Sequence, residues 1–477
     1  MTLPRLAIHG HFYQPSREDP FSGLTPPEAG AAPYRDWNDR IAAECYGPNA
    51  AAGNFARIGF DLGPTLGRWL RNERRETHDA IAAQGAGHGV MAQAYHHAIL
   101  PLAGARDRRT EIHWGLRDAE LRFGHRPTGL WLPETAVDLL TLRIAAEAGV
   151  RYTILAPWQA ATGGLDARRL YRVALGAGRH MIVAFYDGAL SAAVSFEPSA
   201  TADVARFAAQ RARPSAGEAL PDGHATLTVL ATDGELYGHH MPFRDLFLES
   251  LTTTSGDELG LDVTTIGDVL ADPHPMPLPV MAIRDQTSWS CHHGILRWSG
   301  ECPDAADGRW KRPLRLALER LAAAIDVISE REAGELGVDI WAARDRWVDV
   351  ASGYLDEGGA IERIQAAAGK GRRAAARVAA SANAATRLTI LLRAQTSRLA
   401  MFASDAWFWD DPARIETAQA MRLAAHAARL IDQLASTRLE ATLAADLAAL
   451  RSPTTRLDGA ELYGMALRAV DQPPPAA

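Results

Sequence analysis

Two acidic residues stand just past short apolar runs, where paired carboxylates can do acid and base chemistry. Glu134 follows the run 129–133, and Asp233 follows the run 227–231. Cleavage of a glycosidic bond needs a negative charge on one face of the sugar ring and a proton donor at the leaving oxygen. Two carboxyl groups about 5 Å apart perform both tasks with retention of configuration. Their proximity also raises the pKa of one, which keeps a proton available near neutral pH.

Each acid also has a simpler structural interpretation. A carboxylate where a helix begins near Thr135 serves as a cap, and Asp-Gly after a strand is commonly only a turn. Beside the first acid stands Trp131, a candidate platform for a sugar ring. A turn does not require Glu235, His239 and His240, which follow the second acid. Local pattern leaves both interpretations open for each position.

Histidines gather near two further apolar runs. His9 and His11 are two residues apart in a strand-like run, so their side chains leave the same face, and Gln14 follows. Such a pair can hydrogen-bond sugar hydroxyls, hold a metal, or be satisfied within the structure. His97 lies in a second cluster, Tyr-His-His before an apolar run. That cluster is weak evidence, because a histidine beside a strand is more often structural than catalytic.

The segment 285–302 contains four residues of types that bind zinc: Cys291, His292, His293 and Cys302. Their spacing matches no usual structural zinc pattern. The alternative, which we favour, is a substrate-binding loop that presents Trp289 and Trp298. No metal or other cofactor is expected in the chain.

Short apolar runs recur through the first 300 residues and predict parallel strands. They lie at 6–12, 129–133, 151–157, 181–186, 225–231 and 280–283. Segments with helical spacing separate them, such as 138–148 and 201–213. Alternating strands and helices predict βαβ units in a barrel or a large doubly wound sheet. In both architectures chemistry takes place at the C-terminal ends of the strands, where Glu134 and Asp233 are expected.

The composition changes after about residue 305. The segments 313–332, 363–400 and 414–450 are rich in Ala, Leu and Arg with apolar residues three and four apart, which predicts helices. An aromatic island at 402–411 contains Asp405 and Trp407, which suit either a helical core or contacts to a sugar ring. Residues 472–477 are expected to fray.

Bulk properties exclude several classes of protein. The net charge of -7 over 477 residues disfavours nucleic-acid binding, which needs a positive surface. No run of about 18 apolar residues predicts a membrane span, and the N-terminal residues lack a secretory signal pattern. Three cysteines do not make a disulfide framework. A soluble protein of the reducing cytoplasm is expected, with no nucleic-acid or membrane partner.

Taken together, these segments resemble glycoside hydrolase family 57, the α-glucan-active family of amylases, 4-α-glucanotransferases and branching enzymes, in an uncharacterised subgroup. Five segments look like the family's motifs in the correct order: 9–15, 97–102, 129–134, 233–239 and 403–407. There are departures from the family pattern. Phe12 and Tyr13 separate His11 from Gln14, and Ala406 separates Asp405 from Trp407.

The resemblance implies an α/β fold, an incomplete (β/α)7 barrel over residues 1–305, followed by a helical region over 306–477 that closes over the active site. It makes Glu134 the nucleophile and Asp233 the general acid/base of a retaining enzyme that needs no metal. The expected substrate is an α-1,4-glucan or malto-oligosaccharide, which is hydrolysed or transferred. The expected substrate-binding residues are His9, His11, Gln14, His97, Trp131, Glu235, His239, Trp289, Asp405 and Trp407.

Two other functions are compatible with parts of the pattern. A metal-dependent polysaccharide deacetylase on a related barrel holds its metal with an Asp and two histidines; His9 with His11, or His239 with His240, are the available pairs. A non-catalytic glycan-binding protein with a degenerate site is the other alternative, although both acids are present.

Overall fold

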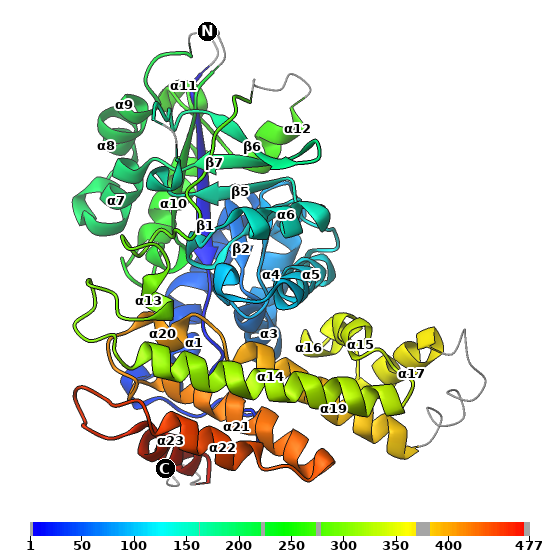
Figure 1. The fold of residues 1–477 in the computed structure, drawn as a ribbon. Helices are drawn as coiled ribbons and strands as arrows, with labels where there is room; N and C mark the ends of the chain where they lie inside the picture. The colour runs from blue at the N-terminus through cyan, green and yellow to red at the C-terminus, as the bar shows by residue number, and fades with distance from the viewer. Residues whose placement is uncertain (1–2, 162, 221–224, 273–277, 369–381, 472–477) are drawn as a thin grey trace. The chain divides into compact units, whose positions relative to one another are not determined.

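A computed structural model describes residues 3–161, 163–220, 225–272, 278–368 and 382–471 (Figure 1). The chain forms two compact units. The first consists of Met1–Gln14, Glu28–Tyr95 and Ala119–Ser290, and the second of Pro15–Pro27, His96–Asp118 and Cys291–Ala477. The assignment of 1–305 and 306–477 as functional domains stays a prediction.

The first unit is built on one open, curled sheet. Its parallel strands stand in the order β7-β5-β4-β3-β2-β1-β8. They are β1 (Arg5–Phe12), β2 (Gly59–Leu62), β3 (Val90–Gln93), β4 (Gly129–Trp131), β5 (Tyr152–Leu155), β7 (Arg179–Phe185) and β8 (Leu227–Asp233). The strand β6 (Leu170–Gly176) is antiparallel to β7, and β9 (Asp262–Thr264) pairs with β1. The predicted α/β fold with an incomplete seven-stranded barrel is confirmed.

Five of the predicted strand runs form strands, and the sixth does not. Residues 280–283 make only isolated bridges, Val280 to Arg172 and Ile283 to Ala160. Pro279 has no N–H to donate to a ladder, and the Val280 side chain is exposed. The strands β2, β3 and β9 have three or four residues each and were not recognised in the sequence.

Helices follow most strands of this unit. They include α3 (Pro64–Glu73), α4 (Arg75–Gln84), α6 (Leu139–Glu147), α7 (Gly188–Phe196), α10 (Arg244–Thr253) and α12 (Ile266–Ala271). The helix predicted at 138–148 is α6, capped by Asp138. The one predicted at 201–213 is broken into α8 (Val204–Phe207), a π-helical turn and α9 (Arg213–Ala216). Pro214, which lacks a backbone donor, lies in the first turn of α9.

The interior of the sheet changes from apolar to polar along β1. Alternate side chains of a strand share a face, so Ala7, His9 and His11 point the same way. Ala7 lies in the apolar core, next in register to Val229 on β8. His11, four residues further on, is level with Asp233. The polar side chains therefore lie at the C-terminal ends of the strands, next to the apolar core that the earlier residues of the same strands form.

The second unit is helical. Its elements include α14 (Lys311–Glu335), α15 (Ile340–Arg346), α17 (Glu357–Ala368), α19 (Ala382–Ala400), α21 (Ile415–Ala435), α22 (Leu439–Leu447) and α23 (Gly459–Asp471). Figure 1 shows α14, α19 and α21 running side by side. The helices predicted at 313–332 and 414–450 are confirmed, the latter as α21 and α22. Within 363–400, α17 and α19 are seen, while 369–381 and the predicted frayed tail lie outside the described residues.

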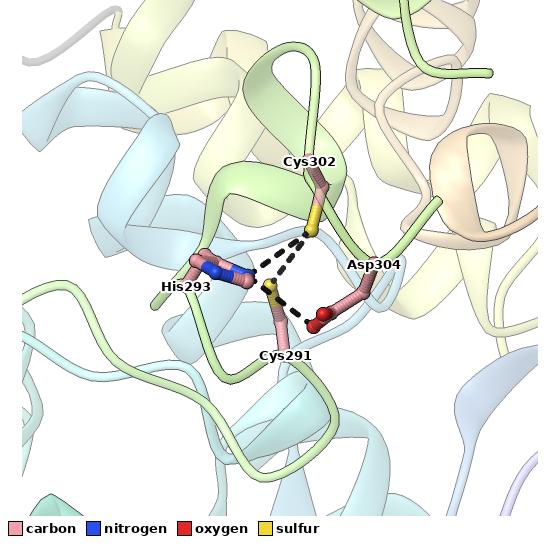
Figure 2. A group of neighbouring side chains, drawn as sticks. All are labelled: Cys291, His293, Cys302 and Asp304. Carbon is pink, nitrogen blue, oxygen red and sulfur yellow. Dashed lines mark hydrogen bonds and ion pairs between the residues drawn. The ribbon is translucent and has the colours of Figure 1, made fainter. Parts of the chain in front are cut away.

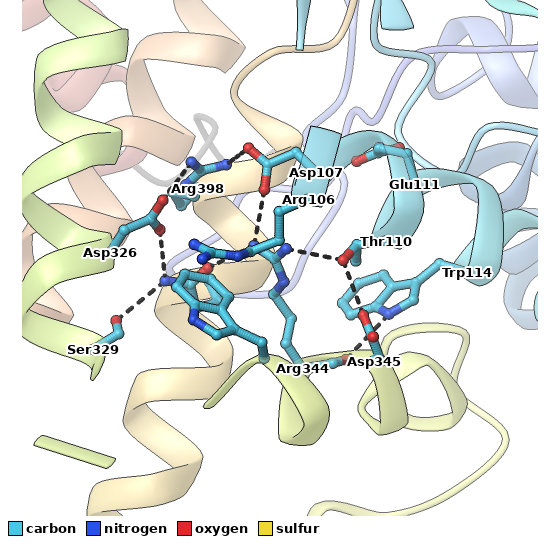
Figure 3. Close-up of polar contacts among 12 residues, drawn as sticks. Arg106, Asp107, Thr110, Glu111, Trp114, Asp326, Ser329, Arg344, Asp345 and Arg398 are labelled. Atoms are coloured by element: carbon cyan, nitrogen blue, oxygen red, sulfur yellow. Dashed lines mark hydrogen bonds and ion pairs between the residues drawn. The ribbon is translucent and has the colours of Figure 1, made fainter. Parts of the chain in front are cut away.

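A buried ion network joins four helices of this unit, including α5 (Ala105–Phe123), which belongs to it up to Asp118 (Figure 3). The Arg344 guanidinium is almost completely buried and donates to Asp107 Oδ1 at 3.0 Å and Thr110 Oγ1 at 2.9 Å. Arg398 pairs with the other oxygen of Asp107 and with Asp326 Oδ2 at 2.8 Å. One carboxylate thus balances two arginines that have little access to water.

Replacing Asp107 with Asn should destabilise the helical unit strongly. The variant leaves Arg344 and Arg398 buried with too little negative charge, which costs about 3 kcal/mol in the free energy of unfolding. Chemical denaturation followed by circular dichroism measures this difference. Glu357→Gln is the control, because the Glu357 pair with Arg393 is largely exposed and should contribute about 0.5 kcal/mol. Equal losses in the two variants would contradict the prediction.

Candidate active site

A buried histidine–carboxylate group lies at the C-terminal ends of β1 and β2. Asp61 on β2 is level with His11 on β1 and has no exposed surface. Its Oδ1 is 2.9 Å from His9 Nε2, and its Oδ2 is 2.8 Å from His11 Nδ1. Both carboxylate oxygens are therefore hydrogen-bonded, and both histidines point at the same acid.

His11 carries a positive charge in this setting. Burial by itself would lower the pKa of the imidazole, but the charge and hydrogen bond of Asp61, with Asp233 and Glu235 nearby, raise that pKa from 6.5 to about 9. The pKa of Asp61 is lowered by the same histidines, which outweigh its burial. An imidazolium thus stands among the acids of the site at neutral pH.

Trp131 supports the two histidines from one side. Its ring stacks on His9 with centroids 5.0 Å apart and on His11 with centroids 4.9 Å apart. Stacking a cation on an indole face is favourable. The Trp131 ring has no exposed surface. The strand register turns the side chain into the interior, and its contact with a sugar stays a prediction.

Glu134 lies in a tight turn directly after β4. Its φ of 58° is in the left-handed region, which a residue with a side chain rarely adopts. Thr135 shares this conformation, and Gln159 holds it through hydrogen bonds of 3.0 Å to Oγ1 and 2.9 Å to the carbonyl oxygen. Asp138, not Glu134, caps the next helix, so the capping interpretation is wrong. Strain of this kind concentrates at functional sites.

The Glu134 carboxylate is held by two side-chain donors. Trp289 Nε1 donates to Oε2 at 2.9 Å, and Ser290 Oγ donates to the same oxygen at 2.6 Å. The Trp289 backbone N–H also donates to the Glu134 carbonyl at 3.0 Å. Burial raises the pKa of Glu134, the two donors oppose this rise, and the charge of Asp233 adds to it. The two carboxyl groups therefore lie within electrostatic reach of each other.

Asp233 ends β8, and its side chain reaches solvent. Surrounding protein still raises the pKa of its carboxyl, while the His11 charge opposes the rise. It accepts no hydrogen bond from any residue that the structure describes. The turn that follows is tightly packed, since a Cβ at Gly234 would lie 2.4 Å from the Phe12 ring. The chain therefore turns here, as Asp-Gly predicts, and also presents a free carboxyl group.

Glu235 is a second buried acid beside Asp233. Its Oε1 accepts from Tyr46 Oη at 2.6 Å and from the Tyr13 backbone N–H at 3.2 Å. Burial raises the pKa of Glu235 to about 7, against the effect of the Tyr46 hydrogen bond. Gln14 contributes a hydrogen bond to Tyr46. Glu235 is thus buried and hydrogen-bonded to Tyr46 and Tyr13 rather than exposed to solvent.

The two histidines after Glu235 have different surroundings. His239 Nδ1 lies 2.6 Å from Glu44 Oε2, and its ring makes a tilted contact with His240 at a centroid distance of 5.0 Å. His240 is exposed, and burial of part of its ring lowers its pKa while Asp233 opposes that change. Of the pair, His240 is the one within electrostatic reach of Asp233.

Four residues of this site were not predicted from the sequence: Asp61, Tyr46, Tyr186 and Ser290. Asp61 is the single acid of an apolar four-residue strand, a weak but usable signal. Ser290 follows Trp289 directly in the segment considered for substrate binding. Tyr186, at the end of β7, faces Trp289 edge-on, and burial with the Asp233 charge raises its pKa. Nothing in the sequence around Tyr46 indicates its role.

Three expected site residues belong to the helical unit. The His97 ring is buried with Nδ1 2.6 Å from Ser404 Oγ, and the Ser404 N–H donates to the His97 carbonyl at 3.0 Å. Asp405 is the next residue and begins α20 (Asp405–Phe408). The Trp407 ring is fully buried, and its Nε1 donates to the Lys311 carbonyl at 3.2 Å. Trp407 therefore packs in the helical core, and a sugar contact by this residue stays a prediction.

Two known protein families match separate parts of the chain. The model of glycosyl hydrolase family 57 matches residues 9–275, more than half of the chain. The chain belongs to glycosyl hydrolase family 57. The predicted family and enzyme class are therefore confirmed. A domain family of unknown function, DUF3536, matches residues 307–471. Among curated proteins, none matches the chain by sequence.

Solved structures share the fold of this family 57 chain. An exo-type maltose-forming amylase from Pyrococcus sp. ST04 matches 97% of the chain and 88% of its own length, with a TM-score of 0.74 at 15% identity. A family 57 branching enzyme from Thermococcus kodakaraensis matches 98% of the chain and 94% of its own length, with a TM-score of 0.59 at 15% identity. No helix in the described part of the chain has the length and apolar character of a membrane span.

The hydrogen bonds of Asp61 to His9 and His11 should control both the charge of His11 and the stability of the family 57 barrel. In Asp61→Asn the pKa of His11 should fall to or below 6.5, and the free energy of unfolding at pH 6 should drop by about 3 kcal/mol. Because the folded-state pKa of His11 is about 9, its contribution is full below pH 6.5 and is lost as the pH rises through 9. The difference in the free energy of unfolding between the wild type and Asp61→Asn should therefore become smaller as the pH rises through 9.

NMR titration of the imidazole and chemical denaturation from pH 6 to 10 measure the two effects. Asp79→Asn is the matched control, since Asp79 also pairs with a histidine but is half exposed, and it should change stability by about 0.5 kcal/mol. An unchanged His11 titration in Asp61→Asn would show that the charge has another origin.

Proposed function

We propose that this enzyme cleaves α-1,4-linked glucans with retention of configuration, with Glu134 as the nucleophile and Asp233 as the general acid/base. The substrate class follows from the family and from the amylase and branching enzyme whose fold the chain shares. A 4-α-glucanotransferase from Thermococcus litoralis is also similar, with a TM-score of 0.55 at 14% identity, over 91% of the chain and 60% of its own length.

The unequal hydrogen bonding of the two acids is the observation that carries the assignment. Donors from Trp289 and Ser290 favour the ionised form of Glu134, as a nucleophile requires. Burial raises the pKa of both acids, but Asp233 accepts no such bond from the described residues, so its protonated form is favoured relative to that of Glu134. Reversing the two roles would leave the proton on the group with the better anion stabilisation.

In the first step a Glu134 oxygen attacks the anomeric carbon of the sugar. The bond to the leaving oxygen breaks, and the Asp233 proton goes to that oxygen. In the second step the Asp233 carboxylate takes a proton from water or from a sugar hydroxyl. The oxygen of that water or hydroxyl then attacks the anomeric carbon, and the bond to Glu134 breaks. Water gives hydrolysis, and a glucan hydroxyl gives transfer.

The remaining expected residues are proposed to surround the sugar. His9, His11, Gln14, Glu235 and His239 would act from the polar layer around the acids. Trp289 would combine its hydrogen bond to Glu134 with ring contacts to substrate. The expectation that His97 and Asp405 bind substrate stays a prediction. None of the three cysteines forms a disulfide, which supports a location in the reducing cytoplasm.

The roles of the two acids can be separated with substrates of different leaving groups. Asp233→Asn should lower kcat on malto-oligosaccharides by about 10³-fold, because the leaving oxygen needs the proton. It should be much less impaired on 4-nitrophenyl α-maltoside, whose leaving group needs little protonation, and a glycosyl-enzyme should accumulate and be visible by mass spectrometry. Glu134→Gln should be inactive on both substrates.

Glu147→Gln, a change in a surface ion pair with Arg179, is the control and should retain activity. NMR of the first-formed product should show the α-anomer, and product sizing distinguishes hydrolysis from transfer. An inverted product would overturn the nucleophile assignment. Full activity in Glu134→Gln, together with deacetylation that a chelator abolishes, would favour the metal-dependent alternative. Absence of turnover with tight glucan binding would favour a binding protein.

A further inference from the structure

Four side chains outside the catalytic centre converge within the helical unit (Figure 2). Cys291, His293, Cys302 and Asp304 place one sulfur, nitrogen or oxygen atom each within 4.8 Å of one another. The two sulfurs are 3.6 Å apart, Cys302 Sγ is 3.7 Å from His293 Nδ1, and His293 Nδ1 is 3.3 Å from Asp304 Oδ2. All four atoms face a common centre.

Three of the six separations among the four ligand atoms match the edges of a zinc tetrahedron, and all six lie within 4.8 Å. With Zn–S near 2.3 Å, Zn–N near 2.05 Å and Zn–O near 2.1 Å, tetrahedral angles give edges of about 3.8 Å for S to S, about 3.6 Å for S to N and about 3.4 Å for N to O. The observed 3.6, 3.7 and 3.3 Å agree within 0.2 Å. A disulfide would require the two sulfurs to be about 2.05 Å apart.

The chain forms the cluster from two short segments of the same design. Cys291 and His293 are two residues apart, and so are Cys302 and Asp304. A turn follows each cysteine, with Gly294 N–H donating to the Cys291 carbonyl at 3.2 Å and Ala305 N–H to the Cys302 carbonyl at 2.9 Å.

The set of possible zinc ligands identified from the sequence differs from the cluster in the structure. It included His292, which is not in the cluster, and it omitted Asp304, which is. The substrate-loop alternative also relied on Trp298, whose ring is fully buried. Spacing alone therefore hid a set of two cysteines, one histidine and one aspartate.

We propose that Cys291, His293, Cys302 and Asp304 bind one structural zinc ion. Four protein ligands fill a tetrahedral site and leave no position for a reacting water, which is the arrangement of structural zinc. The buried sulfurs lie on the inner side and the exposed histidine and aspartate on the outer side, so an ion can enter from solvent. The ion would take no part in the proposed chemistry of Glu134 and Asp233.

The surroundings complement the charge of such a site. Two thiolates, a carboxylate and Zn²⁺ leave one net negative charge. The Lys311 side chain is buried, and its Nζ has no hydrogen-bond partner among the described residues. Burial and Arg297 lower the pKa of Lys311 to about 8, while the charges of Asp410 and both cysteines oppose this. Thiolates fixed by a metal would keep the ammonium protonated.

The position of the site in the chain suggests what the ion stabilises. Ser290, which donates to Glu134, is joined by one peptide bond to Cys291. The ion would fix the backbone immediately after the Trp289–Ser290 donor pair. Helix α13 (Leu296–Ser299) lies in the loop between the two ligand segments, which the ion would close.

Metal analysis of the full-length chain tests the proposal. Protein expressed with zinc in the medium and dialysed against metal-free buffer should contain one zinc per chain by plasma mass spectrometry. His293→Ala and Asp304→Asn should lose the ion. The neighbouring His292→Ala and Asp307→Asn are the matched controls and should keep it, since neither residue is in the cluster. Chelation should lower the Tm of the wild type and leave that of His293→Ala unchanged.

Thiol counting separates zinc from a disulfide. Three thiols should be found in unfolded protein without reductant, because none of the three cysteines forms a disulfide. A single thiol would mean that Cys291 and Cys302 are bonded and would overturn the proposal. Equal zinc contents in His293→Ala and His292→Ala would also overturn it. Glu134→Gln should hold zinc as the wild type does, so failure of the catalytic proposal and failure of the metal proposal give different results.

Discussion

Asp61 is shielded from solvent and is hydrogen-bonded to one ring nitrogen of His9 and one of His11. An unpaired carboxylate at such depth would be strongly destabilising, so the acid and the histidines depend on one another. The parallel register sets this group, because it places His11 level with Asp61 on one side and with Asp233 on the other. The resulting cation lies within electrostatic reach of Glu134, Asp233 and Glu235. Without it, three further acids in so small a region would repel one another.

The scaffold around this centre favours position over local stability. Glu134 and Thr135 both have left-handed backbone conformations, and neither is a glycine. Gln159 holds the second of them through side-chain hydrogen bonds, while Trp289 holds the first through its backbone and its ring. In this conformation the Glu134 carboxylate accepts hydrogen bonds from Trp289 and Ser290 instead of capping a helix.

Sequence patterns revealed those features that depend on neighbours along the chain. Acids that follow apolar runs, such as Glu134 and Asp233, were found in this way, as were five of the strands and most of the predicted helices. Asp61 was missed because β2 has only four residues and no periodicity to recognise. The direction of the Trp131 side chain could not be predicted, because it follows from a register that only the assembled sheet defines. Asp304 was not grouped with Cys291 and Cys302, since it lies just beyond the segment 285–302 and nothing in its spacing marks it as a ligand.

The charge of His11 has a consequence for both halves of the proposed reaction. Before the first step the negative charge resides on Glu134 and the proton on Asp233. After it, Glu134 is an uncharged ester and Asp233 is the anion. The reaction therefore moves one negative charge between two positions that His11 stabilises, since it lowers the pKa of each acid. A fixed cation near both positions needs little reorganisation when the charge moves, which is how preorganised charges lower a barrier. Asp61 keeps that cation in place throughout, because its own pKa is low and its two oxygens are occupied by the rings it holds.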